Sequence, residues 1–470
     1  MDALRQGGTA VDAAIAVALT QVATNLGAVV SYAGVAELVY YEARTRRVYA
    51  LDAGWGTYAA ERDPGSIPAM DVGVVTGDAR STIAPAQGRK TLVPGFMAGL
   101  EAAHGRFGRV AWGDLFAPSI WYARHGVRIT PILSAWFKLQ APQLSRTEEG
   151  RRFLDASGGN IPRVGDRFAQ PDLAALLEGV AHHGSAHMYA GPWARAFVET
   201  VRREGGAATL DDLRRYRPDW ETTRHIGFAG GEVVGPGDAN ASGRAILAAL
   251  DRLSANPPAQ PYWRDPAAFA AYSAAVRAGL IETFASGHHS AAVVVVDKAG
   301  NVAALVHSIN APMWGDTGIV VQGVPLSGAA GLYKARLAAL PAGGRVPSDM
   351  APVVALRAGR PVLAVASVGS SLHHETVGMV AAGLLGQDLA EAMAAPPLLL
   401  NINGTAVEPI PAGAYPGAFT AELERLGVSV QEQPAERVAA LRGTVAFAQI
   451  SPEGVSSAEA PQTVTFGQAR

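Results

Sequence analysis

Two apolar segments near residue 300 constrain the fold of this 470-residue chain more than any other feature. Residues 291–296 are an unbroken apolar run with four valines, and residues 302–309 are a second segment of strand character. The turn Asp297-Lys298-Ala299-Gly300-Asn301 joins them. This pattern predicts a β-hairpin that is buried on both faces.

The rest of the chain alternates between strand pairs and groups of helices. Strands are predicted at 35–41, 47–51 and 361–366, and residues 56–90 read as a long surface loop. Helices are predicted at 10–24, 91–106, 172–183 and 192–204. A further helix is predicted after a Pro-rich linker at 256–261, and another begins at residue 372. Alternation in blocks favours a layered α+β fold over a Rossmann-type order.

Composition narrows the classes of function. Hydrophobic residues make up 49% of the chain and charged residues 17%, as in a compact protein with a large core. With 41 acidic and 39 basic side chains, the chain has no excess of positive charge that would indicate binding to nucleic acid or to an anionic membrane. The short apolar stretch at 13–19 reads as part of a helix rather than as a signal peptide. The absence of cysteine fits a reducing compartment, so we expect a cytoplasmic protein without nucleic-acid or membrane partners.

Motifs for metals, nucleotides and classical triads are missing. The histidines at 182–183, 187, 288–289 and 373–374 lack metal-ligand spacing, and neither a Walker A motif nor G-x-G-x-x-G after a strand is present. No G-x-S-x-G elbow occurs either. We therefore expect neither a metal nor a cofactor.

Two local features could carry chemistry. The strand-to-helix turn Ser367-Val368-Gly369-Ser370-Ser371 could direct backbone N–H groups at a developing oxyanion, but it could equally be an ordinary helix cap. Ser290 directly precedes the strand at 291–296 and, taken alone, could be a plain strand-start residue.

A series of motifs in one order decides between these readings. The chain resembles the γ-glutamyltranspeptidase family. The resemblance rests on these segments: Gly7-Gly8-Thr9-Ala10-Val11-Asp12-Ala13-Ala14, Val93-Pro94-Gly95, Pro118-Ser119-Ile120, Gln170-Pro171-Asp172-Leu173-Ala174, Tyr189-Ala190-Gly191, Asp211-Asp212-Leu213 and Arg345-Val346-Pro347-Ser348-Asp349-Met350-Ala351-Pro352. Each segment is modest, but their shared order from Gly7 to Pro352 is specific.

The resemblance implies a four-layer αββα sandwich of the N-terminal nucleophile hydrolase class. Family members cleave themselves before a nucleophile that opens a strand ending in Asp-x-x-Gly-Asn. Here that position is Ser290, so the cut would fall between His289 and Ser290. Residues 1–289 would then form a large-subunit-like segment and residues 290–470 a small-subunit-like segment, together building one fold as a heterodimer.

The resemblance also assigns roles. The free α-amine of Ser290 would act as the base for its own hydroxyl, which would form an acyl-enzyme. Ser308 aligns with a hydroxyl that hydrogen-bonds the nucleophile, and Asn310 with a residue that contacts a small-molecule substrate. Gly369 and Ser370 align with the family's oxyanion hole.

The substrate-recognition residues of the family are altered. Where the family has an arginine for the substrate carboxylate, this chain has Ala53-Gly54-Trp55, and residues 327–332 contain no acid for the substrate amine. The family's paired serines are Ser348 and Asp349 here. Losing both charged contacts removes what identifies a glutamyl group.

Three hypotheses follow. The first is a self-processing hydrolase or acyltransferase for a non-γ-glutamyl substrate, such as a specialised metabolite, cleaving an amide or, as in alkylproline antibiotic pathways, a carbon–carbon bond. The second is a catalytically silent homologue that acts as a binding partner. The third is a true γ-glutamyltransferase with relocated substrate contacts. In the first case we expect Trp55, Ser308, Asn310, Ser348 and Asp349 to line the substrate site.

Overall fold

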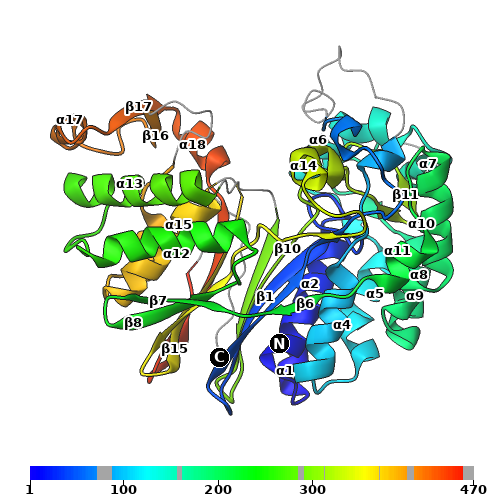
Figure 1. Ribbon diagram of the computed structural model, residues 1–470, viewed down its shortest axis with the longest axis horizontal. Coiled ribbons are helices and arrows are strands. Elements are labelled where there is room, and N and C mark those ends of the chain that lie inside the picture. Colours follow the sequence, from blue (N-terminus) through cyan, green and yellow to red (C-terminus); the bar gives the residue numbers. More distant parts are fainter. Residues whose placement is uncertain are drawn as a thin grey trace.

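A computed structural model describes residues 1–70, 87–155, 161–283, 290–311, 313–369, 371–399 and 407–458. Two sheets lie face to face, with helices on both outer sides (Figure 1). One sheet has the strand order β6-β2-β1-β10-β9, and the other β19-β18-β15-β14-β8-β7. The predicted αββα sandwich is confirmed.

The five-stranded sheet is antiparallel throughout. Its strands are β1 (Val35–Glu42), β2 (Arg47–Ala53), β6 (Asp219–Glu221), β9 (Ala291–Val296) and β10 (Val302–Ser308). The six-stranded sheet contains β7 (Arg224–Phe228), β8 (Gly231–Gly235), β14 (Val353–Arg357), β15 (Arg360–Val368), β18 (Thr444–Ser451) and β19 (Gly454–Ser456).

Pairs of short strands lie outside the two large sheets. They are β3 (Trp55–Gly56) with β13 (Arg345–Val346), β4 (Val127–Arg128) with β5 (Arg167–Phe168), β11 (Val320–Val321) with β12 (Val324–Pro325), and β16 (Val407–Pro411) with β17 (Ser429–Gln433). The β3–β13 pair matters most for function, because it ties two candidate site segments together.

Helices of the described residues form the outer layers and the peripheral regions. In chain order they are α1 (Asp2–Arg5), α2 (Ala10–Thr24), α4 (Phe96–Phe107), α5 (Ala117–His125), α6 (Pro131–Leu144), α7 (Glu148–Asp155), α8 (Pro171–His183), α9 (Ala186–Tyr189), α10 (Pro192–Arg203), α11 (Leu210–Arg215), α12 (Ala241–Ser254), α13 (Pro266–Thr283), α14 (Ala329–Ala338), α15 (Leu372–Leu384), α16 (Leu389–Ala394), α17 (Gly417–Arg425) and α18 (Ala435–Leu441).

Alternation of side chains along the strands builds three core layers. On β1, Leu38 and Tyr40 pack toward α2 and α4, whereas Val35 and Val39 face the other sheet. The far side of the second sheet packs against α12, α13 and α15. Two apolar clusters fill the space between the sheets, one of them at the end where β10 and β15 finish.

Most predicted elements are found, with two corrections. The helix expected at 91–106 begins only at Phe96, because residues 91–95 are extended: Val93 bridges to Gly56, and Gly95 and Phe96 both donate to the Gly34 carbonyl. The hairpin at 291–308 is fully buried only along β10. β9 is an edge strand and is partly exposed at most positions.

Both sheets draw strands from either side of position 290. β1, β2 and β6 precede it and pair in one sheet with β9 and β10, which follow it. In the other sheet β7 and β8 precede it, and β14, β15, β18 and β19 follow. Neither the segment before residue 290 nor the segment after it therefore holds all the strands of either large sheet.

Candidate active site

Ser290 lies at the head of the edge strand β9 and is half-buried. Ala291 pairs with His307 across the β9–β10 ladder, so continuing the register by one residue places Ser290 opposite Ser308. On its other side Ser308 pairs with Val35 of β1. The two serines thus share one end of the five-stranded sheet. His289 lies outside the described residues.

Ser308 and Asn310 form a tight local arrangement after β10. Ser308 is fully buried, and its hydroxyl oxygen accepts a hydrogen bond of 2.8 Å from the Asn310 backbone N–H. Asn310 has a φ of +49°, a left-handed conformation that asparagine tolerates better than most residues. This turn fixes where the Asn310 side chain points.

Trp55 meets Asn310 from the other side of the sheet. The indole N–H of Trp55 donates to Asn310 Oδ1 at 2.9 Å, and both side chains are buried. Asn310 Nδ2 is also buried but has no hydrogen-bond partner within the described part of the chain. The structure therefore brings together two residues that were predicted as substrate contacts from distant parts of the sequence.

Ser348 and Asp349 approach through the β3–β13 pair, in which Val346 lies opposite Trp55. The Ser348 hydroxyl oxygen accepts from the Met350 N–H at 3.1 Å. Asp349 is buried and accepts from Arg336 at 2.9 Å and from the Tyr333 hydroxyl at 3.3 Å. Its negative charge is thus compensated by α14, the helix that begins where the family has its acidic residue.

Gly369 ends β15 and precedes α15. Its φ is +97°, and a Cβ atom there would lie 2.8 Å from Gly443 Cα, so both the conformation and the space require glycine. Val368, Val306 and Trp55 belong to one apolar cluster, and Ala292 packs against it. The end of β15 therefore lies at the same end of the sandwich as the starts of β9 and β3. Ser370 lies outside the described residues.

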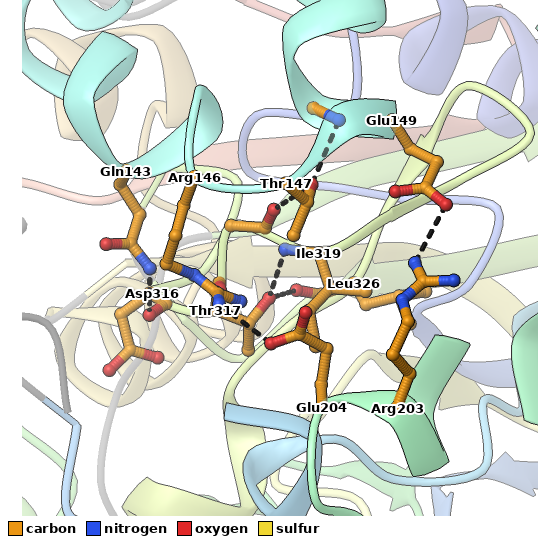
Figure 2. Close-up of polar contacts among 12 residues, drawn as sticks. Gln143, Arg146, Thr147, Glu149, Arg203, Glu204, Asp316, Thr317, Ile319 and Leu326 are labelled. Atoms are coloured by element: carbon orange, nitrogen blue, oxygen red, sulfur yellow. Dashed lines mark hydrogen bonds and ion pairs between the residues drawn. The ribbon is translucent and has the colours of Figure 1, made fainter. Parts of the chain in front are cut away.

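The loop after Asn310 is anchored by the polar contacts drawn in Figure 2. Gln143 donates to the Asp316 carbonyl at 2.6 Å, and Arg146 bridges the Thr317 carbonyl at 2.8 Å and Glu204 at 2.7 Å. Beneath these contacts, buried Lys90 forms an ion pair of 2.5 Å with Asp316. Helices α6 and α10 thereby hold the loop that follows the site.

A row of acids, in which Glu37 and Asp52 are buried and Asp219 is exposed, lies next to the site and was missed by sequence reasoning. Glu37 pairs with Asp52 across β1 and β2, and Asp52 pairs with Asp219 of the edge strand β6. Arg345 joins the row, contacting Asp219 at 3.2 Å and the Asp52 carbonyl at 2.8 Å. The signal was present in the sequence, because Glu37 interrupts an otherwise apolar strand.

Burial shifts the protonation of this row. Both carboxyl oxygens of Glu37 are buried, and the Ser348 side chain beside them favours the charged form. Burial, with Asp52 and Glu221 nearby, holds the pKa of Glu37 well above its usual range. Burial also raises the pKa of Asp52 to about 7, although Arg345 and the Gly54 N–H, which donates to Asp52 at 2.6 Å, oppose the shift. Both groups therefore keep their proton to a higher pH than an ordinary carboxyl group does.

Two buried histidines near the site are uncharged. Burial lowers the pKa of His307 and of His374 to about 3. His307 donates from Nε2 to Gln21 at 2.8 Å, whereas neither ring nitrogen of His374 has a partner. Within the described residues, no group of three or more His, Cys, Asp or Glu side chains is arranged to hold a metal ion.

The two stacked sheets lie between layers of helices, and Ser290 lies at the start of the edge strand β9. This arrangement is the fold of N-terminal nucleophile hydrolases. A cephalosporin acylase from Bacillus halodurans superimposes with a TM-score of 0.80 at 18% identity, over 98% of this chain and 91% of that one. The protein LmbA superimposes with a TM-score of 0.72 at 20% identity, over 98% and 94% of the two chains. These likenesses establish the shared fold.

Sequence comparison gives the family. The profile of the gamma-glutamyltranspeptidase family matches residues 1–261 and 259–463, and the chain belongs to this family. The glutathione hydrolase 5 proenzyme of Rattus norvegicus is 31% identical over 216 residues, which are 46% of this chain and 36% of that protein. The glutathione hydrolase proenzyme of Pseudomonas aeruginosa is 30% identical over 227 residues, 48% and 38% of the respective lengths. The matched region therefore spans little more than a third of these curated relatives.

Among the described helices, none combines the length and the apolar character needed to cross a bilayer.

Proposed function

We propose that this protein is a self-processing N-terminal nucleophile hydrolase whose nucleophile is Ser290 and whose substrate is not a γ-glutamyl compound. The observation that carries the proposal is the placement of Ser290 in register with Ser308, one turn from the buried Asn310–Trp55 pair. Membership of the family supplies the reaction class.

The proposed chemistry needs only groups of this chain. Attack of the Ser290 hydroxyl on the His289 carbonyl moves the chain onto oxygen as an ester, and water then releases the 1–289 segment as a free carboxylate. The α-amine of Ser290, now free, takes the hydroxyl proton when the oxygen attacks a substrate carbonyl. That proton passes to the leaving group as the acyl-enzyme forms, and water resolves the ester.

Charge on the substrate carbonyl oxygen would be stabilised by backbone donors. We assign this role to the N–H groups of Gly369 and Ser370, at the start of α15. Support comes from the glycine-only geometry at residue 369 and from the shared apolar cluster that joins Val368 to Trp55.

The residues around the site favour an uncharged acyl group. The segment Ala53-Gly54-Trp55 has no arginine where the family has one, and Ala329 and Ala330 are fully buried in the segment where the family has an acid. Asp349 is already paired with Arg336. We propose a specialised metabolite as substrate, cleaved at an amide or at a carbon–carbon bond beside a carbonyl. A cytoplasmic location stays a prediction from composition.

Mass spectrometry of the purified protein tests the processing step. We expect fragments of 289 and 181 residues (470 − 289 = 181), and a single intact chain for Ser290→Ala. Wild-type protein that stays intact after long incubation would contradict the proposal and favour a silent homologue that acts by binding.

A further inference from the structure

The hydrogen bond between Trp55 and Asn310 fixes the orientation of a buried amide. Rotating the amide group of an asparagine side chain by 180° exchanges its oxygen and nitrogen atoms, so the hydrogen-bond partners decide which atom is which. An indole N–H can only donate, so the atom 2.9 Å away must be the carbonyl oxygen of Asn310. The Asn310 NH2 group must then point the other way.

That NH2 group is available for a ligand. Asn310 is buried, with 3% of its surface exposed, and Nδ2 has no hydrogen-bond partner among the residues that the structure describes. A buried donor without a partner is costly, at about 1–3 kcal/mol, and native proteins seldom keep one without a use. The backbone N–H of Asn310 is already bonded to Ser308, so the side chain cannot turn away freely.

The position of this donor relative to Ser290 suits an acyl chain. Asn310 follows Ser308 by two residues, and Ser308 lies opposite Ser290 in the ladder. Two residues of chain span at most about 6–7 Å along the strand, and the step across the ladder from Ser290 adds about 5 Å at right angles, so a short acyl group attached to Ser290 would extend toward Asn310. The side chains gathered with Trp55 in this cluster, including Val35, Val306 and Ala330, are apolar.

We propose that Trp55 is a positioning residue that turns the Asn310 amide into a donor, so that this site selects an acyl group carrying a neutral hydrogen-bond acceptor, such as a ketone or amide oxygen, and rejects one carrying an ammonium group. This inference rests on the proposed function of Ser290. An ammonium group would place its N–H donors against the NH2 of Asn310, which has no lone pair free to receive them.

Three p-nitroanilides test the selection in processed enzyme: pentanoyl, levulinyl (the same five-carbon chain with a ketone) and γ-glutamyl. We expect kcat/KM for levulinyl to exceed that for pentanoyl by about fivefold to tenfold, the usual value of one neutral hydrogen bond. The γ-glutamyl anilide should be the poorest of the three. A γ-glutamyl anilide that is turned over fastest would overturn the proposal.

Trp55→Phe is the decisive variant, because it keeps an aromatic ring but removes the indole N–H. With Asn310 free to exchange its oxygen and nitrogen, the preference for levulinyl over pentanoyl should fall to less than about twofold, mainly through KM. Trp193→Phe is the matched control, since Trp193 is equally buried and donates to the Val321 carbonyl at 3.3 Å outside the site. An unchanged preference in Trp55→Phe would refute the positioning role.

A spectroscopic measurement separates this inference from the proposed function. The indole N–H signal that disappears in Trp55→Phe identifies Trp55, and that signal should shift when Asn310→Ala removes its acceptor. A signal that does not move overturns the inference whatever the activity. If the signal shifts but wild-type enzyme hydrolyses none of the anilides, the Trp55–Asn310 orientation stands and the proposed hydrolase function fails.

Discussion

Gly369 satisfies two separate requirements at one position, a left-handed backbone and a close approach to another chain segment. Gly359, in the turn between β14 and β15, satisfies only the first: its φ is +71°, and an added Cβ would meet no atom within 4 Å. The two glycines therefore allow the conformational cost of a side chain to be separated from the cost of overlap.

We expect Gly359→Ala to lower the free energy of unfolding by about 1–2 kcal/mol, the cost of a left-handed conformation for a residue with a Cβ. Gly369→Ala should cost clearly more, because its Cβ would also lie 2.8 Å from Gly443 Cα. Urea denaturation measures both. Equal losses would show that β15 and the Gly443 segment separate easily, which would weaken the case for a rigid oxyanion site.

For single residues, prediction from the sequence worked best where a motif contained the residue. Ser290, Ser308 and Asn310 were assigned from the family resemblance, and Ser290 was placed by counting back from the turn at 297–301. The bond between Trp55 and Asn310 could not be predicted, because 255 residues separate them and no local pattern signals a contact of that kind. The pairing of Asp349 with Arg336 was missed for a similar reason, since it depends on how α14 turns back onto the chain.

Among the secondary-structure elements, strands β1, β2 and β6 hold the row of acids that gives the fold its pH sensitivity. Folding raises the pKa of Glu37 and of Asp52, so the native state binds more protons than the unfolded chain. The stability that these two groups contribute is therefore greatest below the unfolded pKa values near 4 and is lost as the pH rises toward 7, by at most about 1.4 kcal/mol per pH unit for each group.

Glu37→Gln should flatten this dependence. Urea midpoints measured between pH 5 and pH 8 should fall less steeply than in the wild type, and the variant should be the more stable protein at the upper end. Glu424→Gln, at an exposed carboxyl, is the control and should follow the wild type. The same slope in Glu37→Gln as in the wild type would place the titration elsewhere.

A second prediction at the element scale concerns the loop between β10 and β11. Lys90 and Asp316 are 1% and 0% exposed at their side chains, so Lys90→Met would leave a buried carboxylate without its counter-ion, at a cost of about 3–5 kcal/mol. Arg124→Met breaks a surface pair with Glu178 and should cost less than about 1 kcal/mol. Thermal denaturation of the two variants checks the contrast. Similar losses would mean that the loop is held by Gln143 and Arg146 alone.

Element boundaries were predictable wherever hydrophobic pattern and caps agreed. The helix at 10–24 was found to the residue, since Thr9 and Asp12 form a capping box. The start of α4 was not, because residues 91–95 are held extended by backbone bonds to β3 and to Gly34. Tertiary contacts of that kind override the preference of Pro94 for a first helical turn.

Considering the molecule as a whole, the two segments on either side of residue 290 interleave in both sheets. If the chain is cut there, β10 still pairs with β1, and β14 still pairs with β8. We expect the 289- and 181-residue fragments to coelute on size exclusion and to separate only in denaturant. Fragments that part under native conditions would argue against a processed, working protein.

The interleaving of strands also determines the kinetic order of the folding reaction, that is, whether it involves one molecule or two. Before a cut, refolding is a unimolecular search, and loop closure brings β9 and β10 to β1. After a cut, the same sheet can form only when two molecules meet, so recovery from denaturation becomes second order and depends on concentration. A mature protein of this design would fold once, as a single chain. Its lifetime would then be governed by the rate of unfolding rather than by an equilibrium.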